Sequence, residues 1–489
     1  MFHLLKSHLF HLICPILSII LVAFSIFNFG PGITPDSVQY ISASENFIKS
    51  ASFISFDGSS LINWPPMWPF LISIFSLFGH DPFLLSGWLN AFMLAGTVII
   101  SISIFKKLEF SSNITLLGSI LITLSLPLLK ISVMAWSEIT FCFLVTLFIF
   151  MLLRKDKFSE NIATLSLIAA LASLTRYQGI AIIIAGTAII FTNTKKIKLA
   201  LKFLFLSSIP ISIWGIRNYN LSETIFGHRI SPGNEFTNNL NDTFDVISSW
   251  ISTSPFISVF VIVLLSIGLI SAFLNNNHRK DLTISLVTLL FSLIAVMIYS
   301  STQYQIDPIE NRFLAPTFPI FVILSLISIE RLILLTHFRE NLVCIFISLI
   351  WIASNVFIIT SHVTDWNSRG AFGFNHKIWT SSPLIDEILK LPLNATIFSN
   401  APEAIYYLSK RKSKSTPTKS GYEPYLNSLN NSKNNFLVWF PLMKRDYLIG
   451  IPSLRAGLKT EEISNHGVLG QIYIISPKSD EPSSFAPKI

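Results

Sequence analysis

Residues 255–274 read PFISVFVIVLLSIGLISAFL, a run of twenty positions without a charged side chain. An α-helix rises about 1.5 Å per residue, so about twenty apolar residues are needed to cross the hydrocarbon core of a bilayer. The run therefore predicts a transmembrane helix. Other long apolar runs lie on both sides of it, which indicates a chain that crosses a membrane many times.

We expect about eleven membrane-spanning helices, making the fold mainly α. Their approximate positions are residues 9–29, 83–105, 112–130, 137–153, 160–175, 178–193, 199–216, 255–274, 282–300, 313–329 and 341–360. The apolar run from Pro66 to Gly79 is too short to span and begins in a proline-rich segment that cannot be interior helix. We interpret that run as re-entrant or interfacial.

Composition excludes several other classes of protein. The 489 residues are 51% hydrophobic and 13% charged, whereas a soluble globular domain has about 25% charged residues. The 42 Phe residues and the long aliphatic runs exclude a disordered chain. The three cysteines all lie in apolar runs and are too few for a disulfide framework, a zinc knuckle or an iron–sulfur site.

Basic residues give the expected orientation. With the N-terminus in the cytoplasm, most Lys and Arg residues before His362 fall in connections on the cytoplasmic side, as the positive-inside rule requires. An odd number of spans then places the C-terminal tail outside. We expect an integral protein of a bacterial inner or plasma membrane, with a cytoplasmic N-terminus and an extracytoplasmic C-terminal domain.

Charge and hydropathy divide the chain into two domains. Residues 1–361 form the expected membrane domain, with a first outer loop at 30–82, and residues 362–489 form a small soluble α/β domain. In this tail we predict helices at 385–391 and 402–409 and strands at 395–399, 436–440 and 471–475. Because the tail has neither a glycine-rich phosphate loop nor a nucleic-acid-binding motif, we expect no nucleic-acid partner.

Acidic side chains gather at helix ends on the outer side. In the first loop, Thr34 or Asp36 is a candidate N-cap for a short helix from Ser37 to Ile48. Asp36 either caps this helix or has a chemical role. Glu138 begins the fourth span, where it is either a charge favoured by the helix dipole or a second carboxylate beside Asp36.

Three arginines lie on the outer side, against the positive-inside bias: Arg176, Arg217 and Arg312. A single such arginine is most often paired or snorkelling. Three on one face suggest anion binding, since a guanidinium group can hold a phosphate through two hydrogen bonds. The partner of Arg176 is either Glu138 or a ligand phosphate.

The order of these motifs resembles the GT-C membrane glycosyltransferases, and most closely the RgtA/B/C/D-like set. These are relatives of the protein O-mannosyltransferases and the lipid A aminoarabinose transferases. The resemblance rests on Asp36-Ser-Val-Gln-Tyr40, Trp64-Pro-Pro-Met-Trp-Pro69, Ser137-Glu138, Leu174-Thr-Arg176-Tyr177, Trp214-Gly-Ile-Arg217-Asn218 and Asn311-Arg312-Phe313-Leu314-Ala315-Pro316. It covers about residues 30–320, and Ala395-Thr-Ile-Phe-Ser-Asn400 extends it into the tail.

The resemblance implies a polyprenyl-phosphate-linked sugar donor and inverting transfer to a hydroxyl group on the outer face of the membrane. The first-loop aspartate, here Asp36, would act as the base. A second adjacent acid found in the protein mannosyltransferases is replaced by Ser37, so Glu138 is the substitute to test. The acceptor would be a cell-envelope glycan, a lipid or a protein.

We therefore assign Asp36 and Glu138 as candidate catalytic residues. The candidate substrate- and phosphate-binding residues are Arg176, Arg217, Arg312, Tyr40, Trp64, Tyr177 and Glu310. The sequence has no HxxxH motif or clustered carboxylate site, so no metal ligands are assigned and use of a divalent cation stays open. Two alternatives remain, namely a transporter or flippase of a lipid-linked saccharide and a non-catalytic envelope assembly protein.

Overall fold

The computed structural model describes residues 2–153, 158–274, 279–418, 421, 422, 425, 426, 429 and 434–477. The basic residues at 154–157, part of the orientation argument, lie outside these ranges. The chain forms two compact units, and each of them contains two separate stretches of sequence. The first unit is Met1–Pro31 with Ser60–Ser368, and the second is Gly32–Ser59 with Arg369–Ile489.

Helices build the first unit. Its α-helices are α1 (Phe2–Ile26), α3 (Met67–Ser76), α4 (Pro82–Lys107), α5 (Ser112–Thr123), α6 (Leu126–Ser132), α7 (Glu138–Leu152), α8 (Phe158–Thr175), α9 (Ile180–Thr194), α10 (Ile197–Ser222), α11 (Phe236–Ser249), α12 (Pro255–Leu274), α13 (Lys280–Gln303), α14 (Asn311–Leu314), α15 (Phe318–Thr336) and α16 (Glu340–Arg369). Short 3₁₀ turns, Tyr177–Gly179 and Ala315–Thr317, precede α9 and α15. Every segment expected to span the membrane is helical.

Seven helical segments in the described residues are long and apolar enough to cross a membrane. The bent pair α5 and α6, which changes direction by 43° around Ser125 and Pro127, adds an eighth if it counts as one span. Helix α7 is apolar but has only 15 residues. Of the eleven expected spans, it therefore falls below the length of a full span.

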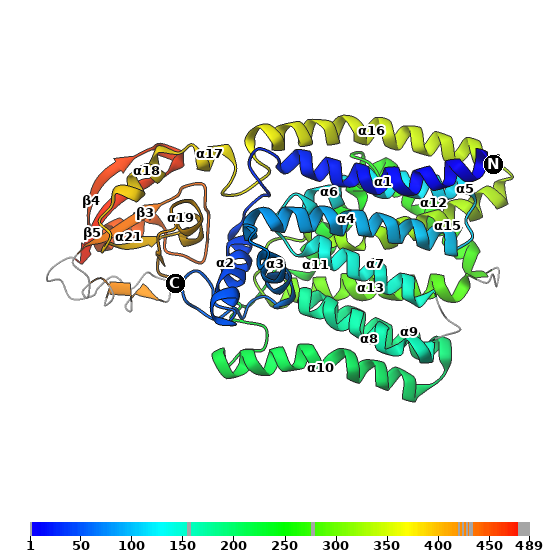
Figure 1. Cartoon of the computed structure of the whole chain (residues 1–489), viewed down its shortest axis with the longest axis horizontal. Helices are drawn as coiled ribbons and strands as arrows, with labels where there is room; N and C mark the ends of the chain where they lie inside the picture. The colour runs from blue at the N-terminus through cyan, green and yellow to red at the C-terminus, as the bar shows by residue number, and fades with distance from the viewer. Residues whose placement is uncertain are drawn as a thin grey trace. The chain divides into compact units, whose positions relative to one another are not determined.

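Packing within the first unit brings together helices that are neighbours in the sequence and helices that are not. Helix α4 packs against α1 and α7, α8 packs against α7 and α10, and α9 packs against α10 and α13. Helices α1 and α16 run side by side (Figure 1), and Nδ2 of Asn28 donates to Oδ1 of Asn367 at 2.9 Å where the two helices end. Much of α12 and α16 is exposed apolar surface, as expected of helices that face lipid.

Helix α3 corresponds to the run interpreted as re-entrant or interfacial. It has ten residues, too few to cross a bilayer. Trp68 and Ile72 are buried against the rest of the unit, whereas Ile74 and Phe75 on the other side are exposed. The helix therefore presents one apolar side to protein and another to its surroundings.

A five-stranded sheet organises the second unit, with strand order β2-β1-β3-β5-β4. Strands β2 (Lys414–Ser415), β1 (Thr396–Ser399) and β3 (Asn435–Trp439) are parallel, and β5 (Gln471–Pro477) and β4 (Leu458–Asn465) complete the sheet in antiparallel fashion. Its other helices are α17 (Lys377–Thr380), α18 (Pro383–Lys390), α19 (Pro402–Ser409) and α21 (Ile451–Gly457). Phe398, Leu437 and Tyr473 lie in its core.

Residues 32–59 of the first outer loop belong to this second unit. Its helix α2 (Pro35–Ser50) packs against α19. Ile33 forms a parallel bridge with Gly373, just after the chain returns from α16. The boundary drawn from the sequence, which assigns residues 30–82 to the membrane domain, thus differs from the compact units. The difference arises because the loop pairs with residues about 340 positions away, which hydropathy does not reveal.

The expected fold class is confirmed: a mainly helical membrane bundle with a small α/β domain. All five elements predicted in the tail are present, and the helix predicted at 402–409 has those bounds. Strands β2 and β4 were not predicted. Strand β2 has only two residues, and β4 reads LKTEEISN, a polar edge strand without the apolar alternation that marks a half-buried one.

Candidate functional site

Glu138 is the first residue of α7 and its side chain is fully buried. Its Oε1 atom accepts from Nη1 of Arg176 at 2.7 Å and from Nε of Arg312 at 2.6 Å. Arg176 follows the end of α8, and Arg312 is the second residue of α14. One carboxylate oxygen therefore joins two of the three outer arginines. Of the two partners expected for Arg176, Glu138 or a ligand phosphate, Glu138 is the one seen in this structure.

The segment before α7 supports this cluster. Asn90 of α4 is buried, and its Nδ2 donates to the carbonyl oxygens of Met134 at 2.6 Å and of Trp136 at 3.1 Å. The guanidinium carbon of Arg312 lies 4.2 Å from the centre of the Trp136 ring, a cation–π contact. Asn90 thus fixes the short segment that carries both the ring beneath Arg312 and the carboxylate beside it.

The Glu138 carboxylate lies below the two arginines. Two guanidinium groups share one of its oxygens, and Oε2 of Glu138 is buried with no hydrogen-bond partner among the described residues. The side chains of Arg176 and Arg312 are 15% and 12% exposed, whereas that of Glu138 is not exposed at all. Both guanidinium groups therefore keep an exposed edge that their shared carboxylate does not have.

Glu310 is the N-cap of α14, next to Asn311 and Arg312. Partial burial raises the pKa of its carboxyl group, Asp307 and Glu138 raise it further, and Arg312 opposes the shift. The side chain is also exposed to water, which screens these charges.

A contact from α11 fixes the start of α14. Nε1 of Trp250, directly after α11, donates to Oδ1 of Asn311 at 2.7 Å. The Trp250 ring also packs edge-on against Phe318, with 5.3 Å between ring centres. Asn311 precedes Arg312, so this hydrogen bond limits movement of the arginine.

A second cluster surrounds Tyr177 at the start of the turn that follows Arg176. The Tyr177 hydroxyl donates to the carbonyl oxygen of Ile62 at 3.0 Å. It accepts from Nε1 of Trp214 at 3.2 Å and from Nδ2 of Asn218 at 3.1 Å. One phenol therefore links the α8–α9 connection, the last turns of α10 and the end of the first outer loop.

Arg217 belongs to this second cluster, not to the Glu138 cluster. Its Nη1 donates to the carbonyl oxygen of Leu61 at 2.8 Å and to Oδ1 of Asn218 at 2.9 Å. Its guanidinium carbon lies 4.2 Å from the centre of the Trp214 ring. Together with Tyr177 and Asn218, it holds the backbone at residues 61 and 62.

The remaining candidate residues lie on both units. Trp64, half-buried, follows the held backbone at 61–62 in the first unit. Asp36 and Tyr40 belong to the second unit, where Asp36 is half-buried in the first turn of α2 and Tyr40 is buried. Thr34, not Asp36, is the N-cap of this helix. The described residues contain no group of three or more His, Cys, Asp and Glu side chains placed to hold a metal ion.

Comparisons with known proteins bear on the fold. No family model matches the chain, and no curated protein matches it. Among solved structures, ArnT from Cupriavidus metallidurans bound to undecaprenyl phosphate has a TM-score of 0.61 at 10% identity, covering 94% of this chain and 97% of that one. The oligosaccharyltransferase AglB from Archaeoglobus fulgidus, in complex with an inhibitory peptide and a dolichol-phosphate, has a TM-score of 0.53 at 12% identity, covering 97% and 75%.

The chain has the GT-C fold. The similarity to ArnT spans nearly the full length of both chains, so it includes the helical bundle and the C-terminal domain alike. With its apolar helices and this fold, the chain is an integral membrane protein. At 10–12% identity, these likenesses concern the fold and do not transfer any residue's role.

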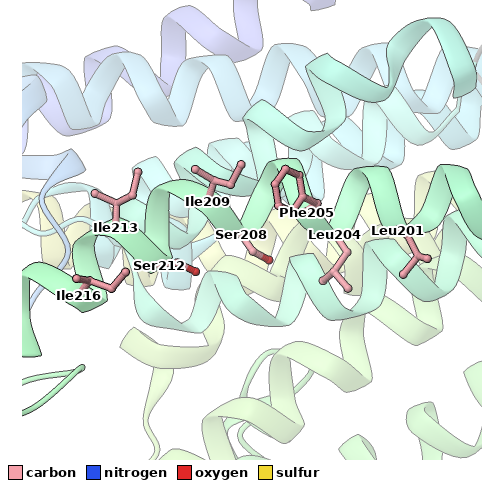
Figure 2. Close-up of a pocket in the computed structure, with 8 residues that line it drawn as sticks. All are labelled: Leu201, Leu204, Phe205, Ser208, Ile209, Ser212, Ile213 and Ile216. Carbon is pink, nitrogen blue, oxygen red and sulfur yellow. The ribbon is translucent and has the colours of Figure 1, made fainter.

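The GT-C bundle has an open apolar depression of about 660 Å³ along α10. Figure 2 shows that its lining side chains, which include Leu201, Phe205, Ile209 and Ile213, all come from this one helix. The only polar groups are the hydroxyls of Ser208 and Ser212. The depression therefore suits hydrocarbon, and it ends at Ile216, next to Arg217.

Several residues of the site were not singled out from the sequence: Asn90, Trp136 and Trp250. Asn90 is the one amide side chain in the apolar α4, a signal that often marks a buried hydrogen bond. Trp136 immediately precedes Ser137-Glu138, but only the structure shows Arg312 above its ring. Trp250 lies in a polar connection in which the hydropathy pattern predicts no contact for it.

Proposed function

We propose that the protein is an inverting glycosyltransferase that moves a sugar from a polyprenyl-phosphate-linked donor to a hydroxyl group. The observation that carries the proposal is the pair of guanidinium groups on Glu138, within a GT-C fold. ArnT was solved with undecaprenyl phosphate and AglB with a dolichol-phosphate. A lipid phosphate is therefore the anion that this proposal assigns to the arginines.

The proposed reaction balances without a further reactant. The acceptor oxygen forms a bond to the anomeric carbon from one face as the bond from that carbon to the phosphate oxygen breaks on the other. Asp36 takes the hydroxyl proton as the general base, and the polyprenyl phosphate leaves with the electron pair of the broken bond. Negative charge grows on the leaving phosphate, and fixed guanidinium groups stabilise such charge.

In this scheme Arg176 and Arg312 bind the phosphate, and Glu138 holds them in place. A guanidinium group has five N–H donors, and the contacts of Arg176 to Glu138 and Ser137 all use Nη1. The geometry supports a positioning role for Glu138 more than the catalytic role assigned from the sequence, because its side chain is fully buried beneath both arginines.

Arg217 and Tyr177 receive a supporting role under the same proposal. They hold residues 61–62 immediately before Trp64 and α3, the apolar helix with exposed Ile74 and Phe75. The hydrocarbon chain of the donor would lie along exposed apolar helices such as α10. The sugar that is transferred, and the acceptor, whether a glycan, a lipid or a protein, are to be identified by experiment. The site would face the extracytoplasmic side of a bacterial inner or plasma membrane.

Asp36→Asn tests the proposal. Envelope glycans are analysed by mass spectrometry from cells with and without the protein, which identifies the transferred sugar, and the purified protein is then assayed with that polyprenyl-phosphate sugar. We expect the variant to lose about 10²–10⁴-fold in kcat, the usual contribution of a general base, while binding of undecaprenyl phosphate persists. Asp57→Asn, an exposed change in the same loop, is the matched control.

If Asp36→Asn keeps the wild-type rate of sugar transfer, Asp36 is not the base. Unaltered glycans together with movement of the lipid-linked saccharide across vesicles would instead establish a flippase. If Asp36→Asn and Arg312→Ala both leave envelope assembly unchanged, the protein is not the transferase.

A further inference from the structure

The two segments that make up the second compact unit are far apart in sequence. Residues Gly32–Ser59, which carry Asp36, cluster with Arg369–Ile489 and not with the helical bundle that immediately precedes and follows them. The second unit therefore contains both the proposed base and the C-terminal domain. The contacts that produce this grouping lie at the two ends of α2.

The first contact lies just before α2. The Ile33 amide donates to the Phe372 carbonyl oxygen at 3.0 Å, and the Phe374 amide donates to the Ile33 carbonyl oxygen at 2.7 Å. Gly373 lies between them with φ +77°, and a Cβ added there would be 1.7 Å from the Ile33 oxygen. Only glycine permits this approach. Asp36 follows three residues after Ile33.

The second contact lies near the other end of α2. The Tyr406 hydroxyl of α19 donates to Oε2 of Glu45 at 3.2 Å. The same ring packs on Phe56, with 5.2 Å between ring centres. Burial, and then Glu45, raise the pKa of Tyr406 to about 12, so the phenol remains a donor at neutral pH.

Between these contacts, the loop is internally braced. The Thr34 amide donates to Oγ of Ser37 at 3.1 Å, which fixes the first turn of the helix where Asp36 lies. Further along, the Phe56 amide donates to Oγ of Ser42 at 3.1 Å. The segment that carries Asp36 is therefore held before α2, within its first turn and near its end.

We propose that the C-terminal domain positions the base of the reaction, with Tyr406 and Gly373 as positioning residues that set the place of Asp36 through α2. This rests on the proposed function of Asp36. The C-terminal domain is then part of the catalytic apparatus, not an appended module. A base must lie within hydrogen-bond reach of the proton that it removes, and a displacement of about 1 Å can reduce the rate about 10²-fold.

The test uses the full-length protein and the polyprenyl-phosphate sugar identified from the glycan analysis. Tyr406→Phe removes the hydrogen bond to Glu45 and keeps the ring on Phe56. We expect kcat to fall about tenfold while the donor KM and undecaprenyl phosphate binding stay within twofold. Tyr473→Phe is the matched control, because it removes a hydroxyl in the same unit, one that donates to Oε1 of Gln471 at 2.8 Å.

Glu45 provides a graded series. Glu45→Gln keeps an oxygen that accepts from Tyr406, so its kcat should be closer to the wild-type value than that of Glu45→Ala. Gly373→Ala, which forces Ile33 away, should lower kcat at unchanged donor KM. Thermal unfolding of each variant confirms that it is folded before kinetics are compared.

The inference is overturned if folded Tyr406→Phe and Glu45→Ala match Tyr473→Phe in kcat. It is also overturned if the donor KM rises in proportion to the loss, since that places the effect on donor binding. If the wild-type protein has no transferase activity, the proposed function itself is wrong. This result is distinct from an active wild type whose variants keep the wild-type kcat, which overturns only the inference about the C-terminal domain.

Discussion

Nε of Arg312 lies 2.6 Å from Oε1 of Glu138, although the two residues are 174 positions apart. The same oxygen is 2.7 Å from Nη1 of Arg176, so a single buried atom determines where two guanidinium groups can be. Such an atom is a sensitive point of the fold, because both arginines lose their partner together when it changes.

Glu138→Gln should destabilise the protein and lower transfer together. Removing one partner of a buried ion pair costs about 3–5 kcal/mol, because the remaining charges stay buried without compensation. Chemical denaturation in detergent measures the free energy of unfolding, and Glu235→Gln, an exposed residue, is the control. Unchanged stability and unchanged transfer would show that the arginines do not depend on Glu138.

Tyr177→Phe should loosen the end of the first outer loop. The lost hydroxyl removes one hydrogen bond from each of the Ile62 carbonyl, the Trp214 indole N–H and the Asn218 amide, at a cost of about 1–3 kcal/mol. Hydrogen exchange of residues 60–65 is expected to accelerate. Tyr219→Phe, an exposed change on α10 next to Asn218, should leave exchange there unaltered, and equal rates in both variants would contradict the assignment.

Gly227→Ala and Gly79→Ala form a pair that separates backbone strain from steric overlap. Both glycines have φ +85°, so both substitutions carry the strain of a left-handed residue, roughly 1–3 kcal/mol. At Gly227 the new Cβ would also be 1.9 Å from Oδ1 of Asn63, whereas at Gly79 it meets nothing within 4 Å. We expect Gly227→Ala to lower the Tm further; equal Tm values would refute the close approach.

Tyr406 gives a pH dependence with a defined sign. Burial and Glu45 raise the pKa of its phenol to about 12, above the ordinary value of about 10. Between these values the unfolded chain loses the proton more readily, so the free energy of unfolding falls as the pH rises from about 10 to about 12. Difference absorbance between wild type and Tyr406→Phe should show a tyrosinate step near the upper value. A step at the ordinary value would mean that the phenol is not buried against Glu45.

Hydropathy predicts the helices of this chain well, because a lipid-facing helix needs little beyond an uninterrupted apolar run. The run 255–274 and helix α12 have the same bounds. Helix α11 (Phe236–Ser249) was not predicted, since its sequence FTNNLNDTFDVISS is rich in Asn, Asp, Ser and Thr, which favour turns over helix interiors. It is held instead by contacts of the folded chain, such as that of Asn239 with Ser301.

The candidate site was predictable in its residue types and not in its pairings. The sequence marks Arg176 and Glu138 as alternative partners because each is a charge beside a membrane span. Nothing local distinguishes Arg217 from Arg312, yet one stacks on Trp214 and holds Leu61 while the other joins Glu138. These choices depend on which helix ends meet, and that depends on packing across the whole bundle.

The two-part origin of the second unit has a consequence for biosynthesis. Residues 32–59 leave the ribosome about 310 residues before Arg369 does, which at about 5–20 residues per second is a delay of roughly 15–60 s. Throughout that interval the contacts of Ile33 with Gly373 and of Glu45 with Tyr406 cannot form. The segment that carries Asp36 is therefore made long before the residues that hold it. If the proposed function is right, the nascent chain should therefore be inactive until Arg369–Ile489 has been made.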